Sequence, residues 1–289
     1  MGDISSLKNR HPCFSGGVNM NNGRIHLPVS PVCNIQCKFC KRDCNKWEQR
    51  PGVTAKVLHP KEAAQIVDKA LALCPQITVA GIAGPGDTLA TTHALETFAL
   101  IHGEHPQLIN CLSTNGLLLE KYAQDLWDAG VRTVTVTVNA VDAHILAGIC
   151  SHVVLDGKMY EGAQGAELLI NAQNRGIEKM SALGAVIKIN TVLIPGINEL
   201  HVEMVAETVK SWGASIMNII PLIPQFEMAD LQPPDCSDLN KARAAAEKHL
   251  SVFRHCQHCR ADAAGIPGKS DISSLLYEYT ETEGTFSHG

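Results

Sequence analysis

The sequence lacks the features that mark nucleic-acid-binding, membrane-inserted and secreted proteins. Its 289 residues carry 24 Lys and Arg against 29 Asp and Glu, a formal net charge of −5, with no run of basic residues. Such a chain has no basic field to attract nucleic acid or an anionic membrane surface. The N-terminus shows no cationic stretch followed by an apolar one, and no apolar run reaches the length of a membrane span. We expect a soluble, cytoplasmic protein without nucleic-acid or membrane partners.

The sequence also lacks internal repeats and low-complexity linkers. Val- and Ile-rich runs alternate with amphipathic stretches, which predicts an α/β fold with a parallel sheet. The expected strands are 24–30, 76–83, 108–114, 133–140, 183–194 and 215–223, and the expected helices are 60–73, 117–129, 161–175, 200–212 and 238–250. Gly130, Gly176 and Gly213 are predicted helix stops. Six such units predict a partial or near-complete TIM-type (β/α) barrel, with ligands at the C-terminal strand ends.

Three segments follow from this pattern. We expect an N-terminal extension at 1–23, a barrel core at 24–236 and a C-terminal extension at 237–289. The acidic tail from Asp271 onward is expected to be poorly ordered.

Cysteine is abundant: the chain has 11, an odd number, partly in C-x-x-C spacing and without a signal peptide. This pattern favours reduced thiols used as metal ligands over disulfides. A single buried cysteine is most simply a small core residue, and we interpret Cys74, Cys150 and Cys236 in that way.

Cys33, Cys37 and Cys40 follow the first expected strand directly. Structural zinc needs four ligands, so a zinc site here requires a distant fourth residue. Three thiolates on a [4Fe-4S] cluster instead leave one iron open to another ligand.

With Phe39 in its aromatic position, this C-x3-C-x2-C motif resembles that of the radical SAM superfamily. The resemblance implies that the three cysteines hold the catalytic [4Fe-4S] cluster, that S-adenosylmethionine (SAM) chelates the open iron, and that an electron from the cluster cleaves the sulfonium. It also implies a SAM site at the strand ends, made by Gly84, Asp87, Ser113, Asn115, Asn139, Ile194 and Asn198. Thr88 departs from the pattern, in which a proline is expected.

Cys256 and Cys259 form a C-x-x-C pair near the end of the sequence. Arg and His residues flank the pair, which favours thiolates and metal binding. Two thiols are too few for a complete site. His26, alone on the first expected strand, is more often a hydrogen-bonded core residue than a ligand.

Seven segments between about 11 and 268 jointly resemble the NifB family of nitrogenase cofactor maturases. They are 11–15, 26–29, 81–87, 111–116, 136–142, 193–198 and 259–263. The resemblance implies two further [4Fe-4S] clusters, which are substrates fused with a sulfide and a SAM-derived carbide into an eight-iron cofactor precursor. One would be held by Cys13, His26, Cys44 and Cys111, and the other by Cys256 and Cys259.

The implied reaction transfers a methyl group from one SAM and cleaves a second SAM reductively. We expect His26 to mark the corner of the substrate cluster that opens first, as a neutral ligand that is protonated on departure. Glu48 is a candidate carboxylate ligand or proton acceptor. The implied partners are an iron–sulfur cluster donor, a reductant, a cofactor carrier protein and the nitrogenase cofactor scaffold. Many relatives append a carrier-like C-terminal domain, and we expect this chain to be a short form.

Two alternatives stay open at this point. One is a radical SAM enzyme whose additional clusters serve a reaction on an organic substrate. The other is a non-catalytic iron–sulfur scaffold or electron carrier, against which the glycine-rich strand ends argue, because a scaffold needs no SAM site.

Overall fold

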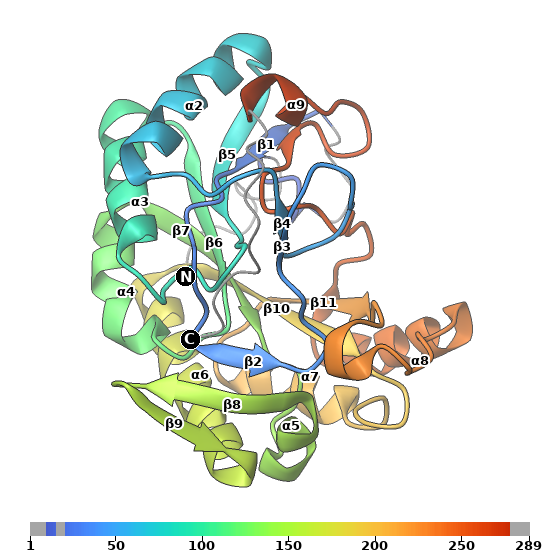
Figure 1. Ribbon diagram of the computed structural model, residues 1–289. Coiled ribbons are helices and arrows are strands. Elements are labelled where there is room, and N and C mark those ends of the chain that lie inside the picture. Colours follow the sequence, from blue (N-terminus) through green and yellow to red (C-terminus); the bar gives the residue numbers. More distant parts are fainter. Residues whose placement is uncertain (1–9, 16–20, 278–289) are drawn as a thin grey trace.

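Eight strands form one curved sheet at the centre of the computed structural model, which describes residues 10–15 and 21–277 (Figure 1). The strand order is β12-β11-β10-β7-β6-β5-β1-β13. The strands are β1 (Gly23–His26), β5 (Ile77–Ile82), β6 (Ile109–Thr114), β7 (Val131–Thr137), β10 (Val186–Leu193), β11 (Ile216–Pro221), β12 (Ser251–Val252) and β13 (Ala264–Gly265). All neighbours are parallel except β1 and β13. The sheet stays open, so the fold is a partial barrel, and all six expected strands are confirmed.

Helices cover the outer face of this sheet, with α2, α3 and α4 side by side in Figure 1. The helices of the described chain are α2 (Pro60–Leu73), α3 (His93–Glu104), α4 (Leu119–Asp128), α5 (Ala143–Ile149), α6 (Gly162–Leu183), α7 (Val202–Ser211), α8 (Cys236–Glu247) and α9 (Ser273–Leu276), with a 3-10 turn at Phe226–Met228. Pro60 begins α2 where its missing N–H costs nothing. Buried apolar side chains such as Phe98 of α3 and Val134 of β7 form the core between helices and sheet.

The predicted stop at Gly176 is wrong. Gly176 lies inside α6, where a Cβ atom would come within 2.7 Å of Leu119 Cβ on α4. The glycine therefore permits two helices to pack closely, and the helix continues to Leu183. Gly184 ends it with a φ of 102°, a conformation that glycine adopts without strain. Gly130 and Gly213, which follow α4 and α7 with positive φ, are confirmed as stops.

Two small sheets that the sequence did not reveal flank the barrel. β2 (Ile35–Cys37) pairs with β8 (Cys150–Leu155), which pairs with β9 (Lys158–Glu161), while β3 (Asp43–Cys44) pairs with β4 (Val53–Thr54). The β2–β8 register places Cys37 opposite Cys150. The partner of β2 lies more than a hundred residues away, so no local pattern announces it.

The chain after residue 236 supplies both edges of the main sheet, β12 and β13. It continues into α9 and Tyr277, whose buried hydroxyl donates a hydrogen bond to the carbonyl of His26. The expected disorder is therefore wrong for 271–277, and the rest of the tail lies outside the described residues. The division into three segments stays a prediction. Within the described part of the chain, no helix combines the length and apolarity needed to cross a bilayer, and the cytoplasmic location stays a prediction.

Candidate active site

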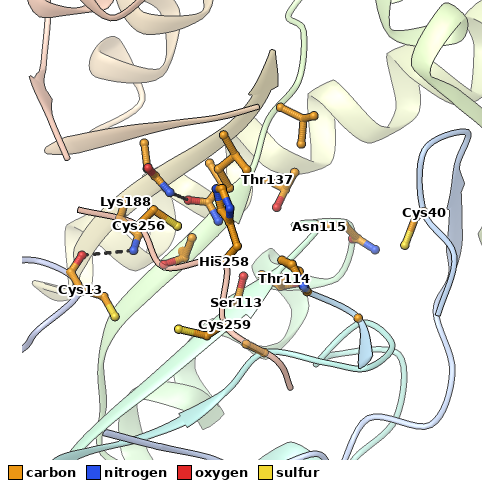
Figure 2. A pocket seen from close by; sticks show the side chains of 18 of the residues that line it. Cys13, Cys40, Ser113, Thr114, Asn115, Thr137, Lys188, Cys256, His258 and Cys259 are labelled. Carbon is orange, nitrogen blue, oxygen red and sulfur yellow. Dashed lines mark hydrogen bonds between the residues drawn. The ribbon is translucent and has the colours of Figure 1, made fainter. Parts of the chain in front are cut away.

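A cavity of about 370 Å³ opens at the C-terminal ends of the parallel strands. Eight of the eleven cysteines line it: Cys13, Cys33, Cys37, Cys40, Cys111, Cys150, Cys256 and Cys259. Figure 2 shows Cys40 at one end, Cys13, Cys256 and Cys259 at the other, and Ser113, Thr114 and Asn115 between them. All eleven cysteines lie in the described residues, and none of them forms a disulfide. One cavity therefore holds two separate groups of soft metal ligands.

The loop with Cys33, Cys37 and Cys40 is held by backbone and amide hydrogen bonds. Cys40 N–H donates to the Cys37 carbonyl at 3.0 Å, and the buried Gln36 amide donates to the same carbonyl at 2.8 Å. Asn115, after β6, has its Nδ2 3.9 Å from Cys33 Sγ. The loop thus contributes three thiols to one wall of the cavity, as a [4Fe-4S] cluster with one open iron requires, and an N–H donor beside them can tune the cluster potential.

The segment after β5 supports this loop. Gly86 N–H donates to Ser30 O at 2.8 Å, and Asp87 N–H donates to Val32 O at 2.9 Å. A Cβ on Gly86 would lie 2.0 Å from Val32 O, so only glycine permits this approach. We expected these glycines to make room for a ligand, whereas at Gly86 the close neighbour is the chain itself, just before Cys33.

Asp87 joins this segment to the end of β6. Its buried carboxylate accepts hydrogen bonds from Asn115 N–H at 2.6 Å and from Thr114 Oγ1 at 2.9 Å. Burial raises the pKa of Asp87, and these hydrogen bonds oppose the rise. Thr88 donates to the carbonyl of Ser113 at 2.6 Å, so the residue that departs from the family pattern ties the same two strand ends together.

The thiols near the loop have high pKa values without metal. Burial raises the pKa of Cys33 to about 12 and also raises that of Cys40, while the positive charge of the buried Arg42 opposes both shifts. A hydrogen bond with Cys150, followed by burial, raises the pKa of Cys37. Metal binding must therefore release protons, and the nearby arginine favours the thiolates that a cluster needs. These residues fit a [4Fe-4S] cluster.

At the other end of the cavity, Cys13, Cys111 and Cys256 pack around Phe14 and Phe253. Burial raises the pKa of Cys13, the charges of Lys188 and Arg24 oppose this rise, and the charges of Cys259 and Cys256 add to it, so both C-terminal thiols act on Cys13. The sequence alone had separated Cys13 from the C-terminal pair.

Cys44 does not line this cavity. Its thiol donates to the Ala55 carbonyl at 3.0 Å on the β3–β4 ribbon. The four-residue ligand set that includes Cys44 stays a prediction.

His26 lies half-buried in the cavity wall. Its Nδ1 lies 3.0 Å from the carbonyl oxygen of Arg260. Because that oxygen only accepts, Nδ1 carries the proton and the lone pair of Nε2 is left for a metal. Burial, and next the charge of Arg24, lower the pKa of His26 to about 4. The imidazole is therefore neutral near pH 7, and burial opposes the protonation that we had expected on departure.

This shift predicts an acid-sensitive metal-free protein. Because the unfolded state binds the His26 proton near pH 6.5 and the folded state only near pH 4, stability is complete above 6.5 and falls as the pH drops toward 4. The expected contribution is about 2 kcal/mol between pH 7 and pH 5. Urea unfolding of metal-free protein at both pH values measures it. A His26→Gln variant should show a smaller difference, and an equal difference would refute the assignment.

Several expected site residues lie elsewhere. Within the described chain, the cavity wall does not include Gly84, Ile194, Asn198 or Glu48. Asn198 accepts from Ile194 N–H and donates to the carbonyls of Asn139 and Val192, so it fixes the strand ends from beneath. The Glu48 carboxylate pairs with Arg50 at 2.5 Å. Phe39, Asp87, Ser113, Asn115 and Asn139 do line the cavity.

Cys74 and Cys150 are buried, as expected, although Cys150 also borders the cavity beside Cys37. Cys236 is exposed at the start of α8, so its interpretation as a core residue is wrong.

Four buried cations in the wall were missed as site residues: Arg24, Arg42, Arg50 and Lys188. Lys188 stands between Ile187 and Ile189 in the strand Val186–Leu193, and a charged residue between apolar neighbours in a buried strand indicates an inward-facing functional position. That signal was present in the sequence.

Comparison with known proteins agrees with this geometry. A model of the radical SAM superfamily matches residues 27–209, more than half of the chain. The crystal structure of Streptococcus suis SuiB bound to S-adenosylmethionine has a TM-score of 0.58 at 11% identity, covering 79% of this chain and 50% of that one, and shares the fold alone. The chain belongs to the radical SAM superfamily and is a radical SAM enzyme, whose cofactors are SAM and a [4Fe-4S] cluster.

Two relatives identify the family within this superfamily. FeMo cofactor biosynthesis protein NifB of Methanocaldococcus infernus is 49% identical over 285 residues, 98% of this chain and 94% of the relative. The NifB of Methanocaldococcus jannaschii is 48% identical over 268 residues, 92% and 89% of the two chains. Within the superfamily, the chain belongs to the NifB family of FeMo cofactor biosynthesis proteins.

Proposed function

We propose that the chain fuses two substrate [4Fe-4S] clusters with a sulfide and a SAM-derived carbide into an eight-iron precursor of the nitrogenase cofactor. One SAM donates its methyl group, and another is cleaved reductively to a radical that removes hydrogen from that methyl group. The observation that carries the proposal is the presence of two clusters of cysteine thiols at opposite ends of one cavity. Family membership supports the same reaction.

In this proposal Cys33, Cys37 and Cys40 hold the SAM-binding cluster, which when bound supplies the electron for SAM cleavage. The Gln36 amide holds the loop by its hydrogen bond to the Cys37 carbonyl, and the Asn115 amide places an N–H donor next to Cys33 Sγ. Ser113 and Asn115 lie in the middle of the cavity, and Asn139 also lines it, so SAM would meet polar groups there. SAM placed there lies between the two clusters of cysteine thiols. The two substrate clusters and SAM are then held in one site, so they react without having to meet in solution.

The substrate clusters are proposed to bind at the other end. Cys13, Cys111, Cys256 and Cys259 line that end, and His26 offers a neutral nitrogen ligand. A neutral ligand donates less charge than a thiolate, so the iron that it holds is the more easily released. Cluster donor, reductant, carrier and scaffold proteins complete the proposed pathway.

SAM labelled in its methyl carbon tests this proposal. Anaerobic protein loaded with iron and sulfide is incubated with labelled SAM and dithionite, then separated from small molecules. The label is expected to remain with the iron, whereas label in the adenine ring is not. A Cys111→Ala variant should retain little methyl label, and Cys236→Ala should match the wild type. Methyl label recovered only in small molecules would contradict the proposal.

A further inference from the structure

Two buried cations at the substrate-cluster end have no acidic partner among the described residues. Arg24 on β1 and Lys188 on β10 both line the cavity and are each only 6% exposed. In the described part of the chain, neither forms an ion pair with a carboxylate. A buried cation without a counter-ion is costly, and such groups persist where a ligand supplies the missing charge.

Lys188 is held in place by weak contacts. Its Nζ donates to the Cys13 carbonyl at 3.2 Å, the dashed line in Figure 2. It lies 4.6 Å from the ring centre of Phe14 and 5.4 Å from that of Phe253. One carbonyl and two ring faces leave the ammonium group with N–H bonds to give. The ammonium group thus lies between a backbone carbonyl and two aromatic rings, and no carboxylate of the described residues neutralises it.

Arg24 repeats this arrangement beside Cys259. One terminal nitrogen donates to Cys259 Sγ at 2.9 Å, and the other donates to the Gly265 carbonyl at 3.0 Å. Its Nε is buried and has no hydrogen-bond partner. Arg24 therefore already contacts one proposed cluster ligand and keeps a further donor unused.

His11 adds a third donor. Its Nδ1 accepts from the Cys13 N–H at 3.1 Å, so the neutral ring carries its proton on Nε2. That nitrogen is buried without a partner. Donors exceed acceptors here, which suits a ligand that is anionic and rich in acceptors. Sulfides of an iron–sulfur cluster meet both requirements, since they accept N–H hydrogen bonds and the thiolate-bound cluster is negatively charged.

We propose that Lys188 and Arg24 are positioning residues that bind the anionic iron–sulfur substrate and retain it while the cysteine thiolates leave. The inference rests on the proposed function. Fusion adds sulfide and carbide, both anionic, as protein thiolates are displaced. Fixed cations keep attracting the growing cluster after the covalent ligands are gone, whereas thiolates alone cannot do so.

The test uses full-length chains in which Cys33, Cys37 and Cys40 are alanine, so that any iron present belongs to the substrate clusters. Lys188→Met keeps length and contact with the rings but removes the charge, and Lys188→Arg restores the charge. After anaerobic loading, iron release to a ferrous chelator and the reduction midpoint of the clusters are measured. For Lys188→Met we expect release about tenfold faster and a more negative midpoint, with both restored in Lys188→Arg.

The outcomes separate the two proposals. If the background variant loads clusters and Lys188→Met leaves release and midpoint unchanged, the positioning role is wrong and the proposed function stands. If the background variant loads no cluster, both are wrong. A misfolded variant would accelerate release without recovery in Lys188→Arg, and this result also counts against the charge-based role.

Discussion

Replacing Cys33, Cys37 and Cys40 together with alanine is expected to abolish reductive SAM cleavage. These thiols form one wall of the cavity, beside Arg42 and Asn115. Alanine provides no ligand atom. Because loss of even the groups that orient metal ligands costs about 10- to 100-fold, loss of three ligands should exceed 100-fold. Formation of 5′-deoxyadenosine from SAM and dithionite measures the effect.

The matched control is Cys236→Ala, which also removes a thiol but from the exposed start of α8. Its 5′-deoxyadenosine formation should equal that of the wild type. The triple variant should still bind iron through the thiols at the other end of the cavity. More than about a tenth of wild-type cleavage in the triple variant would show that another site holds the SAM-binding cluster.

Asp262→Ala is expected to destabilise the metal-free protein by about 3–5 kcal/mol, because it leaves the buried Arg260 unpaired. Arg260 Nε donates to Asp262 Oδ1 at 2.8 Å, and both side chains are almost fully buried. Asp262 also accepts from the N–H of Ala55 and the hydroxyl of Thr54. The change therefore breaks an ion pair and the contact between the C-terminal segment and the β3–β4 ribbon.

Arg254→Ala is the matched control. Arg254 pairs with Glu247 at 2.7 Å, but both side chains are 41% exposed, so its loss should cost less than about 1 kcal/mol. Anaerobic urea unfolding of both variants at pH 7 compares them. Equal losses would mean that the Arg260–Asp262 pair does not anchor the C-x-x-C segment.

The barrel core was predictable because its strands carry their own signal. β10 is Val- and Ile-rich along its length, and α2 shows helical periodicity after a proline at its first position. The C-x3-C-x2-C loop was predictable for the same local reason, since its ligands lie within eight residues of one another.

Features that depend on distant partners could not be predicted. Cys13 and Cys256, more than 240 residues apart in sequence, pack against the same apolar cluster, and Cys37 faces Cys150 only through the β2–β8 pairing. Gly176 was predicted to stop a helix because the sequence does not distinguish a glycine required for close packing from one required for a positive φ. The position of Lys188 between apolar residues of a strand was visible in the sequence, whereas its lack of an acidic partner among the described residues is visible only in the folded chain.

Iron counting combined with product analysis tests the central claim most directly. Anaerobically loaded wild-type protein is assayed for iron per chain, then incubated with SAM and dithionite and assayed for 5′-deoxyadenosine and S-adenosylhomocysteine. Three [4Fe-4S] clusters correspond to about twelve irons, and the account predicts this content together with both products. About four irons with 5′-deoxyadenosine alone, or release of intact clusters without SAM, would contradict it.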